Sequence, residues 1–325
     1  MNQKHILAVH DISCMGRCSL TVALPVISAA GIIVSVMPTA VLSTHTGGFT
    51  EYTYRDLTED MLPIADHWQT LSASFDAIYT GYLGSQQQLD IVSELVRRFK
   101  TDNTLVVIDP VMADHGQLYK GFSPDFPQGM RELCNCADVI TPNITEALLM
   151  LKEPYKEGPY TPKYICEILE RLSKAGTNKS KDINKSIGKT DKKEGGTSGG
   201  KKDKNEDNTK AKKVVLTGVY FDNYEYGAAT YENGEVYFSF EKKIPGIYHG
   251  TGDLFASVLT AALTSGNSLV MATDIAVKFT TDSIARTHKS GAKIKYGVNF
   301  ERGLQDLYKY IHKQVPFETT NKITS

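Results

Sequence analysis

Two glycines and an aspartate precede an apolar run in the stretch HGTGDLFASVL, residues 249–259. The apolar residues recur at helical spacing, which predicts a helix that begins at Gly250, Thr251 and Gly252. Because the first N–H groups of a helix have no partner within it, this helix start can bind an anion such as a phosphate. Asp253 has two interpretations: it stabilises the helix dipole, or it accepts a proton from an attacking hydroxyl.

Further polar groups follow two predicted strands, in VIDPVMADHG (107–116) and DVITPNITEALLML (138–151). Ligands of an open parallel sheet bind at the carboxyl ends of its strands, so we expect Asp109, Asp114, Asn143 and Glu146 to converge. Their oxygen ligands suit Mg²⁺, which binds one or two carboxylates together with phosphate oxygens. The structural alternative is that Asn143 caps the next helix and Glu146 completes a capping box.

Short β-branched runs alternate with longer helical patterns along the chain. This order predicts an α/β fold with a central, mostly parallel sheet and helices on both faces. A hairpin with an Asn233-Gly234 turn, within 227–240, is expected at one edge of the sheet. Strands are predicted at 5–10, 32–37, 76–81, 104–109, 138–141 and 213–219, and helices at 85–100 and at 164–176, where Gly176 is a natural stop.

The uncharged stretch 19–43 is long enough to suggest a membrane span. Pro25, Gly31 and Pro38 divide it, which favours a buried helix over about 19–30, a glycine turn and a strand. No membrane association is therefore expected.

Residues 177–212 are rich in Lys, Asp, Asn, Gly, Ser and Thr and contain little to bury. The composition predicts a disordered, low-complexity insertion in one domain spanning 1–325. A basic flap beside an anionic ligand is the functional alternative. The GKT at 188–190 is no P-loop, because Ile183 occupies the position of the required glycine.

Composition narrows the classes of partner. A formal net charge of −1 gives no general basis for nucleic-acid binding, and the Lys-rich insertion carries mixed charge without aromatics. The five cysteines form no CxxC pair, and the N-terminus has no signal-peptide pattern, so we expect a reducing, cytoplasmic location.

Four motifs in order, DPVMADHG, ITPNITEA, VVLTGV and GTGDLFASV, resemble the ribokinase-like superfamily of small-molecule kinases. The N-terminal stretches HDISCMGRCSLTVALPVISAAG, PTAVLSTHTGG and IYTGYLGS are similar to its pyridoxal/pyridoxamine kinase branch. The resemblance spans about residues 5–312 without the insertion. It implies ATP-dependent phosphorylation of the 5′-hydroxymethyl group of a vitamin B6 compound, with Mg²⁺ as cofactor, and a homodimer.

Carried over by position, the resemblance makes Asp253 the catalytic base and the backbone of 250–252 the anion hole. It places Asn143, Glu146 and Thr217 at the ATP phosphates, with Glu146 near Mg²⁺. It also implies that Asp109 supports the metal through water and that Asp114 belongs to a possible K⁺ site. It lines the pyridine pocket with Ser13, His45, Thr46 and Tyr82.

One departure concerns the substrate side. Relatives usually read Ser-Asn-His-Thr-Gly-Tyr where this chain has STHTGG, so Gly48 replaces an aromatic residue.

Two alternative functions stay open: a hydroxymethylpyrimidine kinase with the same chemistry on another ring, and a non-enzymatic B6 or nucleotide sensor with the same fold.

Overall fold

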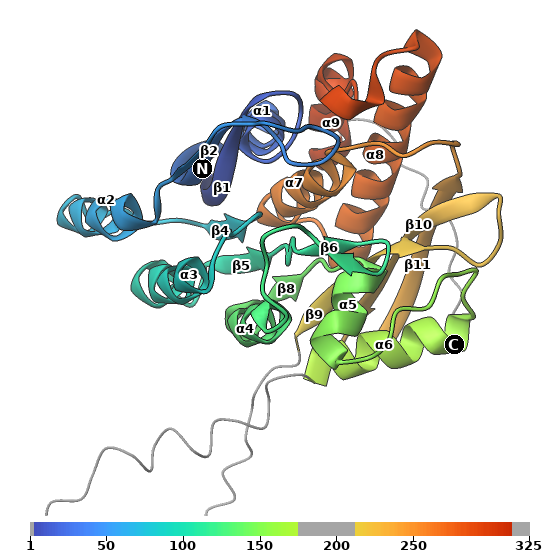
Figure 1. Cartoon of the computed structure of the whole chain (residues 1–325), viewed down its shortest axis with the longest axis horizontal. Coiled ribbons are helices and arrows are strands. Elements are labelled where there is room, and N and C mark those ends of the chain that lie inside the picture. Colours follow the sequence, from blue (N-terminus) through green and yellow to red (C-terminus); the bar gives the residue numbers. More distant parts are fainter. Residues whose placement is uncertain (1–2, 175–211, 314–325) are drawn as a thin grey trace, which may run out of the picture.

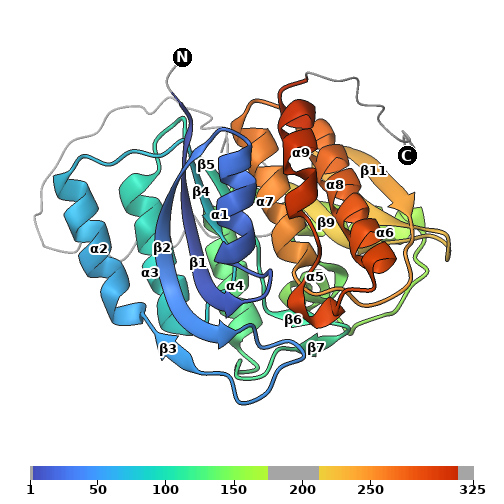
Figure 2. The same ribbon diagram turned by 90° about the horizontal axis from the view of Figure 1, so that it is seen from above.

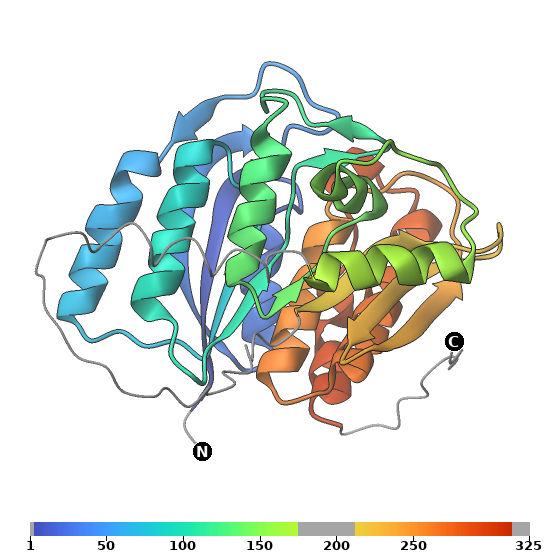
Figure 3. The same ribbon diagram turned by 90° about the horizontal axis from the view of Figure 1, so that it is seen from below.

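A computed structural model describes residues 3–174 and 212–313. Its architecture is three-layered, with a central sheet between two layers of helices (Figure 1). One layer contains α2, α3, α4, α5 and α6, which cover the near face of the sheet in Figure 3. The other contains α1, α7, α8 and α9. The predicted α/β fold is confirmed.

Within the described residues, nine strands form the central sheet in the order β11-β10-β9-β8-β5-β4-β1-β2-β3. The pairs from β9 through β2 are parallel, and the strands outside them are antiparallel. The bounds are β1 His5–Met15, β2 Ile33–Thr44, β3 Tyr54–Asp56, β4 Ala77–Thr80, β5 Leu105–Ile108, β8 Val139–Ile140, β9 Lys213–Val219, β10 Glu225–Glu232 and β11 Glu235–Lys242; β6 Ala113–Asp114 and β7 Gln117–Leu118 form a separate pair.

Alternation along the strands fills both helix layers, because successive side chains of a strand point to opposite faces. Val106 and Ile108 of β5 belong to the core beneath α2–α6, and Val107 belongs to the core beneath α1 and α7–α9. The helices are α1 Leu20–Ala29, α2 Thr58–Thr70, α3 Gln86–Phe99, α4 Phe126–Leu133, α5 Ile144–Leu151, α6 Pro162–Lys174, α7 Thr251–Thr264, α8 Leu269–Ser290 and α9 Leu304–Ile311, with short 3₁₀ turns at η1 Cys134–Cys136, η3 Ile294–Tyr296 and η4 Glu301–Gly303.

The stretch 19–43 is a helix followed by a strand, as predicted, but the strand is longer than expected. Pro38 does not end β2, because the register against β1 shifts between His10 and Ile12 and the strand continues to Thr44. Such a bulge lets a strand continue past a residue that cannot donate to the ladder. Within the described part of the chain, no helix is both long enough and apolar enough to cross a membrane.

The hairpin of β10 and β11 lies at one sheet edge, as predicted, and Asn233 and Gly234 form its turn with φ of 54° and 90°. The opposite edge strand, β3, was not predicted. Helix α6 begins at Pro162, two residues before the predicted start. Gly176 and the predicted insertion, apart from Lys212, lie outside the described residues.

Candidate active site

Helix α7 begins at the predicted glycines and leaves its first N–H groups free of any side-chain cap. Gly250 is the N-cap residue with φ of 72°, and a Cβ there would lie 2.0 Å from the carbonyl oxygen of Arg17. A glycine is therefore required by both conformation and space. A Cβ on Gly252 would meet nothing within 4 Å, so the backbone is open to a ligand at this position. This helix start is called the anion cradle below.

A cavity of about 310 Å³ borders the cradle. It collects residues from the carboxyl ends of β5, β8 and β9 and from the start of α7. The pair of β6 and β7, which follows β5, lies toward the lower edge of the molecule in Figure 2. The predicted residues that line it are Asp109, Asp114, Asn143, Glu146, Thr217, Gly250, Thr251, Gly252 and Asp253. The predicted convergence of strand-end polar groups is thus present.

Asn143 and Glu146 form the capping box given above as the structural alternative. The Glu146 backbone N–H donates to Asn143 Oδ1 at 2.9 Å, and the Asn143 N–H donates to Glu146 Oε2 at 2.9 Å. Glu146 Oε1 also accepts from the Met112 N–H at 3.1 Å. The box fixes a carboxylate at the cavity wall, so capping and ligand binding are compatible roles.

Thr217 and Asp109 are both hydrogen-bonded to residues that follow β8. The backbone N–H of Thr217 donates to the carbonyl of Pro142 at 2.9 Å, and β9 continues past this threonine to Val219. Thr141 Oγ1 donates to Asp109 Oδ1 at 3.0 Å. Burial, with the carboxylates of Glu146 and Asp253 nearby, raises the pKa of Asp109 well above its usual range. Burial likewise raises the pKa of Glu146, despite the N–H groups that donate to it.

Asp253 is half-buried and borders the cavity. Burial raises the pKa of Asp253 to about 7, against a hydrogen bond from the Ser19 backbone N–H, and the Asp11 carboxylate raises it further. A pKa near neutrality suits a general base, because the carboxylate is then both available and basic at physiological pH.

The cavity lining contains four carboxylates and, among the residues described, no lysine or arginine. A polyphosphate beside these carboxylates would be repelled unless a cation lay between them. An oxygen donor set of this kind fits Mg²⁺. No three His, Cys, Asp or Glu side chains in residues 3–174 and 212–313 gather as a metal cluster, so phosphate oxygens and water would supply the remaining ligands.

Two of the four residues predicted for the pyridine pocket lie next to this cavity, although none of them lines it. The Ser13 hydroxyl donates to Asp11 Oδ2 at 3.0 Å. The charge of Asp11 in turn raises the pKa of Asp253. His45 bonds the Lys295 carbonyl through Nε2 at 2.7 Å, so it is a satisfied histidine, and its ring lies 5.2 Å from that of His249.

The other two also do not line the cavity. Thr46 is exposed, and Tyr82 packs against Phe122 with ring centroids 5.6 Å apart. The assignment of these four residues to the pyridine pocket stays a prediction.

The sequence reasoning missed other residues at the site. His249 lines the cavity, and its Nδ1 lies 3.0 Å from where a Cβ on Gly47 would be. A side chain at Gly47 would therefore displace the His249 ring. Asp11 follows the apolar start of β1, so the strand-end rule could have found it. The α8 residues Thr280 and Ile284 also line the cavity and carry no sequence signal.

A three-layer α/β fold with an anion cradle at a helix start and polar strand ends around it is the ribokinase-like fold of small-molecule kinases. The chain belongs to the phosphomethylpyrimidine kinase family, whose family model matches residues 24–181 and 198–298.

Solved structures resemble the chain over almost its whole length. A Bacteroides thetaiotaomicron protein with the provisional name phosphomethylpyrimidine kinase is 35% identical, with 98% of this chain and 96% of that chain covered and a TM-score of 0.82. Its orthorhombic crystal form, with pyridoxal, gives 36% identity over 94% and 96% of the two chains and a TM-score of 0.80. Pyridoxal kinase from Lactobacillus plantarum is 28% identical over 96% and 99%, with a TM-score of 0.78.

A curated relative agrees with these structures. A Schizosaccharomyces pombe protein, provisionally named a pyridoxal kinase, is 26% identical over 272 residues, which cover 79% of this chain and 73% of the relative. The predicted membership of a ribokinase-like kinase family is confirmed.

Proposed function

We propose that the protein transfers the terminal phosphoryl group of ATP to the 5′-hydroxymethyl group of a vitamin B6 compound. The observation that carries this proposal is Asp253, whose pKa is raised to about 7, directly beside the anion cradle. A sensor that only binds its ligand needs no such base. The kinase therefore accounts for the site better than the sensor.

The ring of the acceptor is inferred from relatives. Pyridoxal is present in one crystal form of the Bacteroides protein, and two further relatives are named as pyridoxal kinases. The family model carries the name of phosphomethylpyrimidine kinase, which keeps hydroxymethylpyrimidine as the second candidate acceptor. Both acceptors present a hydroxymethyl group on a heteroaromatic ring, so the reaction is the same.

In the proposed reaction, a carboxylate oxygen of Asp253 accepts the hydroxyl proton while the acceptor oxygen forms a bond to phosphorus and the bond to ADP breaks. The N–H groups of Thr251 and Gly252 donate to the transferred group, whose equatorial oxygens carry the developing charge. Asn143 and Thr217 orient the nucleotide phosphates. Glu146, and Asp109 through water, would hold Mg²⁺, and the ion would supply positive charge that neutralises the phosphates.

A panel of acceptors tests the substrate. Steady-state kinetics with ATP and pyridoxal, pyridoxamine, pyridoxine or hydroxymethylpyrimidine should give the highest kcat/KM for a B6 compound. A wide preference for hydroxymethylpyrimidine would make it the acceptor instead. ATP binding without turnover of any compound in the panel would favour the sensor. The Asp253→Asn variant is the matched control, since it should bind ATP and show little turnover.

The proposal includes one kinase domain over 1–325 with an insertion at 177–212, a cytoplasmic homodimer, and a possible K⁺ site at Asp114. Light scattering measures the oligomeric state. Replacing K⁺ by Na⁺ in the assay, in wild type and in Asp114→Ala, tests the cation: only the wild type should respond.

A further inference from the structure

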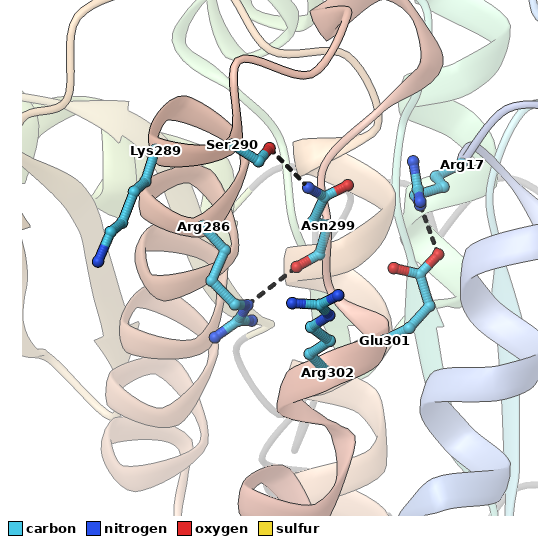
Figure 4. A pocket seen from close by; sticks show the side chains of 7 residues that line it. All are labelled: Arg17, Arg286, Lys289, Ser290, Asn299, Glu301 and Arg302. Carbon is cyan, nitrogen blue, oxygen red and sulfur yellow. Dashed lines mark hydrogen bonds and ion pairs between the residues drawn. The ribbon is translucent and has the colours of Figure 1, made fainter.

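A second cavity, of about 550 Å³, lies between the end of α8, the segment 299–302 and the loop after β1. It shares no lining residue with the cavity at Asp253. Four cationic side chains line it, with one carboxylate, that of Glu301 (Figure 4). The cations are Arg17, Arg286, Lys289 and Arg302. This set is called the basic pocket below.

Arg286 is fixed in place before any ligand arrives. Its Nε donates to the Asn299 carbonyl at 2.9 Å, and its Nη2 donates to Ser283 Oγ at 2.7 Å. The guanidinium also lies over the Phe279 ring at 5.8 Å. A Cβ on Gly303 would lie 2.6 Å from Nη2, so a glycine there leaves room for this arginine. A guanidinium held from one side presents its other edge at little entropic cost.

The charge of the basic pocket is not balanced within the part of the chain that the structure describes. Arg17 pairs with Glu301. Lys289 and Arg302 have no ion-pair partner among residues 3–174 and 212–313. Cations that share a pocket repel one another unless an anion lies among them. Arginine forks bind the oxygens of a carboxylate or of a phosphate in pairs, and a phosphate monoester, with a charge of about −2, balances several cations better than a carboxylate or a halide.

Arg17 connects the basic pocket to the anion cradle. Its carbonyl oxygen packs against Gly250, and its N–H donates to the Tyr296 carbonyl at 3.0 Å. A Cβ on Gly297 would lie 2.6 Å from Arg17 Cβ, so the residue is confined on both sides. Two residues along the chain, the Ser19 N–H donates to Asp253. A shift of Arg17 would therefore reach both the cradle and the base.

We propose that the basic pocket binds a small phosphate ester as an effector, and that Arg17 transmits this binding to the anion cradle. The bound anion would interact with Arg286, Lys289 and Arg302 and compete with Glu301 for Arg17. Phosphomonoesters and nucleotides share this chemistry, so the effector is either the product of a kinase of this kind or a nucleotide.

Calorimetry without other ligands isolates this site as the binding that differs between wild type and K289A/R302A, because both proteins have the same active site. Inorganic pyrophosphate, pyridoxine 5′-phosphate and ADP are titrated separately. A tighter Kd for pyridoxine 5′-phosphate identifies a product-like effector, and a tighter Kd for ADP identifies a nucleotide. We expect the Kd of the tightest probe to rise at least about tenfold in K289A/R302A and to change little in the charge-conserving K289R/R302K.

Turnover supplies the second readout, with ATP and acceptor both saturating so that competition at the active site is removed. The tightest probe should change wild-type kcat at least about twofold, and this response should disappear in K289A/R302A, whose basal kcat stays normal. Equal Kd values in wild type and K289A/R302A would overturn the site. A kcat that never responds would overturn the coupling. The calorimetric result does not depend on which acceptor the enzyme phosphorylates, and thermal unfolding verifies that both variants fold.

Discussion

Replacing Asp253 by asparagine should make the protein less active and, at alkaline pH, more stable. The pKa of this carboxyl is raised from 3.8 to about 7 in the folded protein, so the ionised form is disfavoured there. At about 1.4 kcal/mol per unit, the cost reaches about 4 kcal/mol. Because the side chain borders a cavity, solvent reduces the cost, and we expect about 1–3 kcal/mol.

The sign follows from proton binding. Between about pH 4 and pH 7 the folded state holds a proton on Asp253 that the unfolded state has lost, so this group makes stability fall as pH rises. The gain from Asp253→Asn should therefore be near zero at pH 4 and full at pH 8. Urea unfolding at both values measures it. The exposed Asp114, in the same cavity lining, provides the matched control, and Asp114→Asn should change stability by less than about 0.5 kcal/mol at either pH.

Activity gives an independent readout of the same side chain. By analogy with oxyanion-site donors, loss of the base should lower kcat by about 10²- to 10³-fold. Wild-type kcat/KM should rise with pH to a plateau above an apparent pKa near 7, since only the ionised carboxylate accepts a proton. Near-normal turnover in Asp253→Asn would refute the assignment as base, and a loss of stability at pH 8 would refute the buried-charge argument.

Three further changes test the cradle, the metal and the insertion. Gly250→Ala should lower the free energy of unfolding by about 2–4 kcal/mol, because Gly250 has a left-handed conformation and the new Cβ would clash with the Arg17 carbonyl. Gly252→Ala should keep full stability and lose turnover, because its Cβ would lie in the open space above the cradle. Equal urea midpoints for the two variants would contradict this. Glu146→Gln should raise the Mg²⁺ concentration for half-maximal activity by about tenfold or more in a metal titration, and an unchanged titration would exclude the residue as a metal ligand. Deleting 177–212 should leave kcat/KM within about threefold, and a collapse of activity in a folded variant would make the insertion a functional flap.

Local rules predicted the strand-end residues that line the cavity. Asp109 and Asn143 each follow a strand of the parallel sheet, and parallel strands end at one edge, so their convergence needed no knowledge of distant packing. Helix α7 was likewise predictable, because its start depends on Gly250 and Gly252 and its face on helical spacing. The same rule extended to β1 would have included Asp11.

Long-range packing determines the rest. Thr46 belongs to a loop whose course depends on how His45 meets Lys295, a contact between residues 250 positions apart. Pro38 indicated a strand end, yet tertiary pairing with β1 carried β2 onward through a bulge. Neither outcome has a local signal in the sequence, since both depend on partners far along the chain.

The segment 16–19 contacts the base, the anion cradle and the basic pocket. In the sequence its residues belong to the HDISCMGRCSLTVALPVISAAG stretch, at the start of the helix predicted over about 19–30. In the structure it provides the N–H that bonds Asp253, the carbonyl that requires Gly250, and the side chain of Arg17 in the basic pocket. Because all three contacts come from four consecutive residues, a rigid shift of the segment would alter base, cradle and pocket together. The charge of the basic pocket is therefore best tested at Lys289 and Arg302, which touch neither the cradle nor the base, rather than at Arg17.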